Sequence, residues 1–364
     1  MGLLLPLLLA ASISVQGSNG VPERLLSKLE TGVNVTRWFC YLGSPLDPAH
    51  LKSYLNDQDF ANFKRLSVGF VRLCISPEAI YDDGGLNSTT LPYLDAALTR
   101  FEKAGIAVIW DLHDNGQLKL DQPGHDNSEF VRFWEATAKH YKGKQEDQLV
   151  FEILNEPVFM KNPAVWYALQ KETVAAIRKA DPKRTIMATS TSWSNIDTFV
   201  KMEPLAESNL VYTFHCYDPF IFTHQGASWV GDFPKLLKHI PFPSSPEAVS
   251  AILDEEPEPL RASVVDYGKQ RFGADALKAR IQAASDWGKV HHVPVVLGEF
   301  GAYPLVSPVE SRGRWFEAMR RAVDDLKMPN AIWGYDDALG LGRTTEGGSV
   351  KLDPVSLKSF YRKG

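Results

Sequence analysis

Two glutamates, Glu156 and Glu299, stand where short apolar runs end, in the segments LVFEILNEP and VPVVLGEF. Each run is rich in Val, Leu and Ile and has the length of a β-strand. An ionised carboxylate at the end of a buried strand is costly unless it is paired, so the two glutamates are expected to share one site. Paired carboxylates perform general acid–base and nucleophilic chemistry on glycosidic bonds.

These runs belong to a regular alternation of strand-like and helical segments. Helical patterns such as LDAALTRFEKAG and FVRFWEATAKHYKG lie between most of the strands. The alternation predicts an α/β fold, a single (β/α)8 TIM barrel, and a doubly wound open sheet is the alternative. An open sheet would need a Gly-rich phosphate turn after its first strand, and GVNVTRW has none. The predicted strands are 32–36, 69–75, 106–111, 149–154, 185–189, 210–216, 294–298 and 331–335.

In such a barrel the carboxyl ends of all strands meet at one rim, where catalytic residues gather. The side chains at these ends suit a charged sugar transition state. Arg and Tyr donors keep a nucleophile ionised, His and Asn orient carboxylates or sugar hydroxyls, and Trp lies beneath the ring. The residues are Arg72, His113, Asn155, Glu156, His215, Tyr217, Glu299 and Trp333.

The segment LVFEILNEPV at 149–158 resembles the signature of glycoside hydrolase family 5, the former cellulase family A. GEFG at 298–301 resembles the end of that family's nucleophile strand. VRLCISP, DLHD, HCYDP and WGYDDALG resemble its Arg, His, His-x-Tyr and Trp motifs on strands two, three, six and eight. Asn-Glu-Pro alone occurs by chance, but this ordered set is specific, and it covers nearly the whole chain.

The resemblance implies that Glu156 is the acid/base and Glu299 the nucleophile of a retaining double displacement. It also implies that no metal takes part in catalysis, and no cofactor is expected. The supporting set implied by the family is Arg72, His113, Asn155, His215, Tyr217 and Trp333.

Two features differ from the family pattern and leave the glycan specificity open. Asp114 stands where many members have a second histidine. The interval 219–293 is much longer than an ordinary βα connection, and we expect it to shape the cleft. Trp38, Trp193 and Trp229 follow strand ends or lie in this insertion, so each is a candidate either for a sugar platform or for packing.

Composition fits a soluble globular enzyme: 364 residues, 44% hydrophobic, 23% charged, with a net charge of −5. The basic residues are dispersed, so no nucleic-acid partner is expected. The three cysteines exclude a disulfide framework and a Cys-based zinc motif. Cys40 and Cys74 either pair or remain buried thiols. Asn34 begins a sequon but lies in a predicted strand, which argues against glycosylation there.

The N-terminal residues 1–20 read as a secretory signal peptide, because a short apolar stretch is followed by small and polar residues. No Lys or Arg precedes that stretch. We therefore expect export, to the periplasm or the medium, of one catalytic domain at 21–364, with no membrane attachment in the mature, monomeric form.

The sequence thus predicts a secreted retaining endo-β-glycanase acting on a polysaccharide or oligosaccharide, with β-1,4-glucan as the first substrate to test. An exo-β-glucanase and a β-mannanase are the alternatives within the family. A catalytically silent glycan-binding barrel is the alternative from another class, and the presence of both glutamates with their supporting set argues against it.

Overall fold

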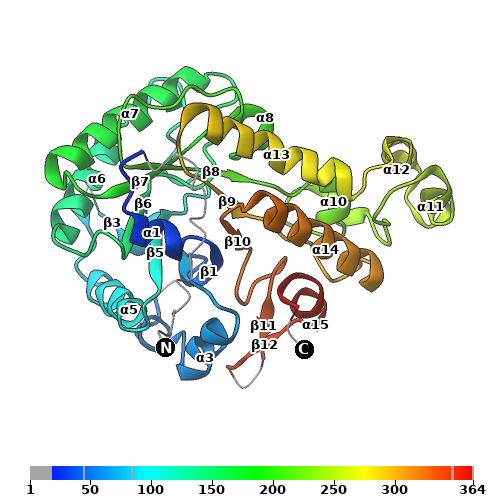
Figure 1. Cartoon of the computed structure of the whole chain (residues 1–364), viewed down its shortest axis with the longest axis horizontal. Helices are drawn as coiled ribbons and strands as arrows, with labels where there is room; N and C mark the ends of the chain where they lie inside the picture. The colour runs from blue at the N-terminus through cyan, green and yellow to red at the C-terminus, as the bar shows by residue number, and fades with distance from the viewer. Residues whose placement is uncertain (1–18, 44–45, 83–84, 346–347, 363–364) are drawn as a thin grey trace, which may run out of the picture.

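The computed structural model describes residues 19–43, 46–82, 85–345 and 348–362. Eight parallel strands close into a barrel in the order β1-β10-β9-β8-β7-β6-β5-β2 (Figure 1). The predicted (β/α)8 barrel is therefore confirmed. The strands are β1 (Thr31–Phe39), β2 (Phe70–Ile75), β5 (Ala107–Leu112), β6 (Leu149–Glu152), β7 (Thr185–Thr189), β8 (Leu210–His215), β9 (Val295–Glu299) and β10 (Asn330–Ile332).

All eight predicted strands are present, and their ends differ from the prediction by a few residues. Strand β6 ends at Glu152, two residues earlier than predicted, because the backbone then leaves regular pairing. The chain nevertheless stays tied to its neighbours, since the Asn155 amide donates to the Leu112 carbonyl across 2.9 Å. That bond holds the residues after β6 at the barrel rim.

The barrel interior changes from apolar to polar along the strands. Alternate residues of a barrel strand point inward. Near the N-terminal end these residues form one apolar cluster, which the helix α1 (Glu23–Lys28) covers through Leu25. Two positions further along four of the strands, the inward residues become Arg72, Asp111, Glu152 and Thr213. The apolar layer therefore supports a buried polar layer directly beneath the rim.

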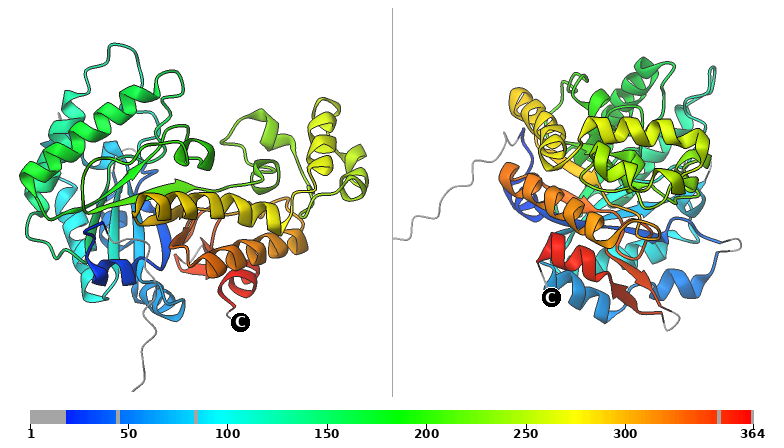
Figure 2. Two further views of the ribbon diagram at one scale, coloured as in Figure 1. Left: turned by 45° about the horizontal axis from the view of Figure 1, so that its top comes forward. Right: turned by 90° about the vertical axis from the view of Figure 1, so that its right-hand side faces the viewer.

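Helices surround the barrel (Figure 2). In α6 (Ser128–Tyr141) the buried positions Phe130, Phe133, Trp134 and Tyr141 recur at helical spacing, which explains why this segment packs on the strands. The larger surrounding helices are α3 (Asp57–Arg65), α5 (Leu91–Lys103), α6 (Ser128–Tyr141), α7 (Pro163–Ala180), α13 (Ala274–His291) and α14 (Val309–Leu326).

Shorter elements complete the connections between strands and helices. They are α2 (Pro48–Ser53), α4 (Pro77–Ile80), β3 (Tyr81–Asp82), β4 (Gly85–Leu86), α8 (Ile196–Phe199), β11 (Gly342–Thr344), β12 (Val350–Leu352), α15 (Pro354–Ser356) and η2 (Leu357–Tyr361).

The long insertion predicted after the sixth barrel strand is present between β8 and β9. Helices α11 (Pro246–Ser250) and α12 (Glu258–Gln270) project to one side of the barrel in Figure 1 and in the left view of Figure 2. The insertion's first half stays at the rim, because Tyr303, after β9, donates its amide to the Thr223 carbonyl across 2.8 Å. Its elements are α9 (Phe220–Thr223), α10 (Asp232–Leu236), α11 (Pro246–Ser250), η1 (Leu253–Glu255) and α12 (Glu258–Gln270), and α13 returns the chain to β9.

Other expectations from the sequence have mixed outcomes. Cys40 and Cys74 are buried free thiols and do not pair. The Asn34 side chain is fully buried.

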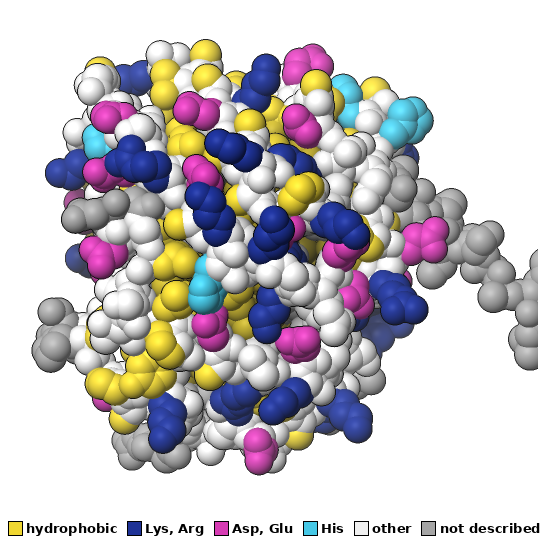
Figure 3. Space-filling model, turned by 90° about the vertical axis from the view of Figure 1, so that its left-hand side faces the viewer, with side chains coloured by type: hydrophobic (Ala, Val, Ile, Leu, Met, Phe, Trp, Pro, Cys, Tyr) yellow, Lys and Arg dark blue, Asp and Glu magenta, His cyan; other side chains and the backbone are white. Residues whose placement is uncertain are grey.

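On the face shown in Figure 3, basic and acidic side chains are interspersed, as the dispersed charges predicted. No helix of the described ranges is long and apolar enough to cross a membrane. Most of the expected signal peptide, residues 1–18, lies outside the described residues.

Candidate active site

Glu299 is the last residue of β9 and accepts hydrogen bonds from two side chains. Arg72 donates from Nη1 to Oε1 across 2.7 Å, and Tyr217 donates from Oη to Oε2 across 2.9 Å. Burial, and then the charge of Glu299, raises the pKa of Tyr217 well above its usual value, so the phenol remains a donor. Donors of this kind stabilise an ionised carboxylate.

Glu156 lies in the turn that follows β6 and has a different environment. Its backbone φ is 45°, in the left-handed region that non-glycine residues rarely adopt and that is common at functional sites. Its side chain is 25% exposed and therefore within reach of a ligand. Removal of the carboxyl from water raises the pKa of Glu156 to about 7, against the opposing effects of His113 and Arg72. Glu156 can therefore carry a proton near neutral pH.

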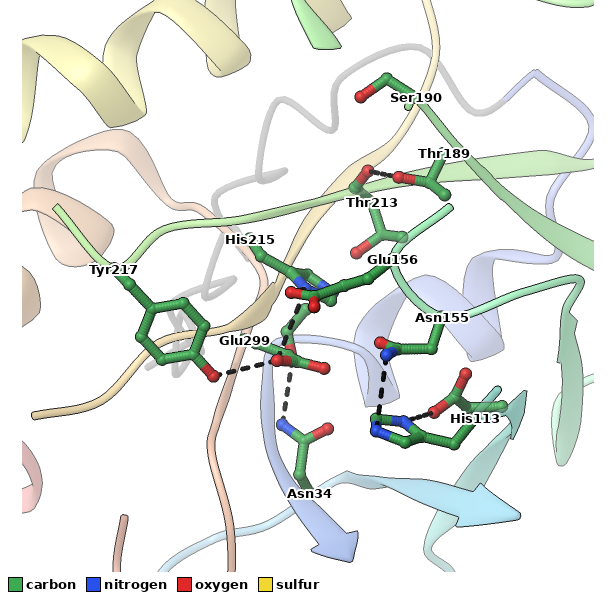
Figure 4. Close-up of polar contacts among 12 residues, drawn as sticks. Asn34, His113, Asn155, Glu156, Thr189, Ser190, Thr213, His215, Tyr217 and Glu299 are labelled. Carbon is green, nitrogen blue, oxygen red and sulfur yellow. Dashed lines mark hydrogen bonds and ion pairs between the residues drawn. The ribbon is translucent and has the colours of Figure 1, made fainter. Parts of the chain in front are cut away.

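His215 lies between the two glutamates (Figure 4). Its Nδ1 is 2.7 Å from Oε1 of Glu156 and 3.4 Å from Oε2 of Glu299. Burial lowers the pKa of His215 to about 4, so the imidazole is neutral at neutral pH. Because Nδ1 faces two carboxylates, its proton belongs on that nitrogen, which then donates to Glu156.

Asn155 is fixed at both ends of its carboxamide. Oδ1 accepts from Arg72 Nη2 across 2.8 Å, and Nδ2 lies 3.4 Å from Nε2 of His113. The other ring nitrogen of His113 is 2.8 Å from Oδ2 of Asp111. Although burial opposes it, Asp111 raises the pKa of His113. The chain Asp111–His113–Asn155 holds the amide at the rim beside Glu156, and Figure 4 shows its contact between His113 and Asn155.

Trp333 and Tyr41 flank the imidazole of His113. The Trp333 ring stacks on it with centroids 5.4 Å apart and an interplanar angle of 26°. The Tyr41 hydroxyl is 3.2 Å from His113 Nε2, and its ring is partly exposed. The eight rim residues that the sequence singled out therefore come together in one site.

The three candidate platform tryptophans separate into two classes. Trp38 is buried and donates from Nε1 to the Leu51 carbonyl across 2.8 Å, so its ring packs in the core and cannot receive a sugar. Of the two roles predicted for Trp38, packing is therefore confirmed, and the role of sugar platform is wrong. Trp193 and Trp229 are 49% and 50% exposed. The Trp193 amide donates to the carbonyl of Pro157, which places this tryptophan next to the turn that carries Glu156.

Several buried polar residues of the site were not predicted from the sequence. Asn34 donates from Nδ2 to the Gly298 carbonyl across 3.0 Å and so holds the strand that ends in Glu299. Asp111 and Glu152 both pair with Arg72, at 3.1 and 2.7 Å. The sequence contains an indication of Asp111 and Glu152, because each is a charged residue inside a predicted apolar strand. Asp114, by contrast, accepts backbone amides in the loop after β5.

Two groups of described residues bring possible metal ligands within 4.8 Å of one another. In both groups the same side chains are already held by hydrogen bonds or ion pairs with each other or with Arg72, which accounts for their proximity. The groups are Cys74, Asp111 and His113, and Glu156, His215 and Glu299.

The site therefore offers two carboxyl groups with different chemistry. Glu299 accepts hydrogen bonds from Arg72 and Tyr217, whereas removal from water raises the pKa of the partly exposed Glu156 to about 7, so that Glu156 can carry a proton near neutral pH. One oxygen of each lies within 4.8 Å of the other. Such a pair can donate a proton to a leaving group and attack a neighbouring carbon.

Comparison with known proteins agrees with this arrangement. The family model described as cellulase, glycosyl hydrolase family 5, matches residues 32–338. Endoglucanase 3 of Fibrobacter succinogenes is 29% identical over an alignment of 345 positions that covers 87% of this chain and 51% of that protein. Endoglucanase C of Acetivibrio thermocellus is 23% identical over an alignment of 317 positions that covers 84% of this chain and 91% of that protein. The chain thus spans only about half of the first relative and most of the second.

Solved structures share the fold. The structure of Cel5A from Thermotoga maritima in complex with cellobiose superposes with a TM-score of 0.72 at 24% identity, covering 93% of this chain and 98% of that one. The cellulose synthase subunit Z of Clostridioides difficile gives a TM-score of 0.71 at 22% identity, covering 90% and 98%.

Proposed function

Because this chain belongs to glycosyl hydrolase family 5, the cellulase family, we propose that it hydrolyses β-1,4-glucan with retention of configuration. The observation that carries the proposal is the contrast between the two carboxyl groups. Arg72 and Tyr217 donate hydrogen bonds to Glu299, while removal from water raises the pKa of Glu156 to about 7. A hydrolase needs one carboxylate to attack and one carboxylic acid to protonate the leaving group.

The spacing of the two groups supports retention. Retaining glycosidases have carboxyl groups about 5–5.5 Å apart, whereas inverting enzymes leave about 6.5–9.5 Å for a water molecule. Here an oxygen of Glu156 and one of Glu299 lie within 4.8 Å, which favours direct attack by Glu299.

In the first step, an Oε atom of Glu299 attacks the anomeric carbon and forms an ester bond. The glycosidic C–O bond breaks, and the departing oxygen takes the proton of Glu156. His215 keeps a hydrogen bond to Glu156 while this proton leaves. Asn155, fixed by Arg72, is placed to bind the 2-hydroxyl, where hydrogen bonds strengthen in the transition state.

In the second step, Glu156 removes a proton from a water molecule, whose oxygen attacks the anomeric carbon. The ester bond breaks, and Glu299 departs as a carboxylate. The donors on Arg72 and Tyr217 assist here, because they stabilise the negative charge that returns to Glu299. The sugar leaves with its original anomeric configuration.

Endo action on β-1,4-glucan is proposed because relatives over most of this chain are named endoglucanases. Exo action is the second candidate, since the insertion borders the rim and could close one end of a cleft. A β-mannanase is a further candidate, because the β-mannanase/endoglucanase A of Caldicellulosiruptor saccharolyticus is 28% identical over an alignment of 120 positions that covers 30% of this chain.

The substrate is tested with a panel of soluble β-glucans and mannans, followed by product-length analysis. Endo-glucanase action predicts a rapid loss of viscosity and a mixture of oligosaccharides from β-1,4-glucan. Release of a single short product from chain ends would assign exo action, and faster turnover of mannan would assign a mannanase. No turnover of any glycan would favour the silent binding barrel. Proton NMR of the first product tests retention.

We also propose that residues 1–20 direct export of the protein, that this segment is then removed by cleavage near residue 20, and that the mature protein acts as a monomer. The supporting observation is the short apolar stretch at the N-terminus. N-terminal sequencing of exported protein should begin near residue 21, and its mass in solution should match one chain. Retention of the whole stretch in the cell would overturn the export proposal.

A further inference from the structure

Every N–H group of the Arg72 guanidinium has an acceptor. The group has five N–H bonds: one on Nε and two on each Nη. Nη1 donates to Asn34 and Glu299 across 3.0 and 2.7 Å, and one bond of Nη2 reaches Asn155 across 2.8 Å. The remaining two, from Nε and Nη2, go to Oε2 and Oε1 of Glu152 across 2.7 and 2.9 Å.

This geometry points to Glu152, and we propose that it is a positioning residue of the reaction. By binding one edge of the Arg72 guanidinium with both oxygens, it orients the plane so that Nη1 meets Glu299 and Nη2 meets Asn155. The proposal rests on the function proposed above, in which Glu299 is the nucleophile and Asn155 binds the sugar.

Glu152 is the only hydrogen-bond partner of Arg72 Nε among the described residues. The other partners of Arg72 bind only its two Nη atoms; they are Glu299, Asn34, Asn155, Cys74 and Asp111. Contacts with the Nη atoms alone leave the guanidinium free to tilt, whereas a two-oxygen contact fixes its plane.

The location of Glu152 makes this role specific to the site. It lies on β6, four residues before Glu156, and its side chain is 1% exposed, so it cannot touch a bound glycan. Arg72 is fully buried beside it. Burial raises the pKa of Glu152 to about 7, against the effect of Arg72, as expected where several carboxylates share one guanidinium. Asp111 also contacts Arg72 Nη2, at 3.1 Å.

The test is Glu152→Gln, which keeps the shape and removes the two-oxygen acceptor. Arg72 retains Glu299 and Asp111 as partners, so the variant leaves no unpaired buried cation and should fold. We expect kcat to fall about 10- to 100-fold, the scale associated with a misplacement near 1 Å, and KM to change less. The loss should be similar for activated aryl glycosides and for oligosaccharides, because Glu299 takes part in both steps.

Two further measurements separate positioning from a structural role. Glu152 and Asn155 both bind Arg72 Nη2, so their effects should not be independent. The fold-loss of kcat in the double variant should therefore be smaller than the product of the fold-losses in Glu152→Gln and Asn155→Ala. The matched control is Glu256→Gln, another buried glutamate, which lies in the insertion and accepts the Lys238 amide. This control should leave kcat unchanged.

The third readout does not depend on turnover. In ¹⁵N NMR, the Nε–H of Arg72 should exchange slowly in the wild type and lose that protection in Glu152→Gln. A folded Glu152→Gln protein with wild-type kcat, or with unchanged Arg72 protection, would overturn the proposal. Failure of the proposed function looks different: the wild type would turn over no glycan, while the change in protection would persist.

Discussion

Arg72 donates to Glu299 across 2.7 Å, and both side chains are buried beneath the barrel rim. A buried carboxylate avoids a cost of several kcal/mol only when it is paired in this way. The same contact must weaken when Glu299 forms an ester and strengthen when the ester breaks. The electrostatic part of the proposed mechanism depends on this pair.

Glu156→Ala should separate substrates by leaving group. Poor leaving groups need the proton of Glu156, so their turnover should fall by about 100-fold or more, while formation of the glycosyl-enzyme from activated aryl glycosides should be spared. Pre-steady-state release of the aryl group measures this step. Equal losses in that step for both kinds of substrate would contradict the assignment.

The pH profile provides a second test of Glu156. A general acid must be protonated, and its pKa is raised to about 7. As the pH rises through 7 the acid loses its proton, so wild-type kcat/KM on oligosaccharides should decline above that pH. In Glu156→Ala this alkaline limb should disappear. An alkaline limb that persists in the variant would assign the decline to another group.

Tyr217→Phe removes one of the two donors on Glu299. A hydrogen bond to a charged group contributes about 1.5–3 kcal/mol, which corresponds to a loss of roughly 10- to 100-fold in kcat. Tyr267→Phe is the matched control, because its hydroxyl donates to a backbone carbonyl in the insertion, at 2.9 Å. Similar kinetics for the two variants would refute a role for Tyr217 at Glu299.

Gly298→Ala tests how closely the strand before Glu299 packs on β8. A Cβ atom there would lie 2.4 Å from Thr213 Oγ1 and 3.2 Å from His215 Nε2. We expect a loss of about 1–3 kcal/mol in stability and a reduced kcat, because His215 must shift. Gly43→Ala, with no atom within 4 Å of its Cβ, should change neither. Thermal melting and kinetics decide the outcome.

Trp193→Ala should raise KM for long glucans severalfold and leave the melting temperature nearly unchanged, because the ring is half exposed. Trp193→Phe should recover part of the affinity. Trp38→Ala should instead destabilise the core by about 3–5 kcal/mol. An unchanged KM in Trp193→Ala would remove this residue from the list of sugar platforms.

The sequence was most informative where strand-like and helical segments alternate regularly. Apolar strands with helices between them predicted the barrel, and residues after strand ends, such as His113 and His215, were correctly brought to one rim. This succeeded because parallel strands end at the same side of the barrel.

The sequence was least informative about polar residues inside strands. Glu152 and Asn34 lie within apolar runs, and only closure of the barrel shows that both bind Arg72. Trp38 was ambiguous for a related reason, since a tryptophan near a strand end can face the rim or the surrounding helices. Its burial depends on packing against Leu51 and its neighbours, which lie outside that strand.

The most direct test of the central claim is the anomeric configuration of the products that two variants form with azide. In Glu299→Gly, azide should replace the missing nucleophile and give an α-glycosyl azide from an activated β-glycoside, by a single inversion. In Glu156→Ala, azide should attack the glycosyl-enzyme and give the β-glycosyl azide, by two inversions. Proton NMR distinguishes the anomers, and a β-product from Glu299→Gly together with an α-product from Glu156→Ala would contradict the assigned roles.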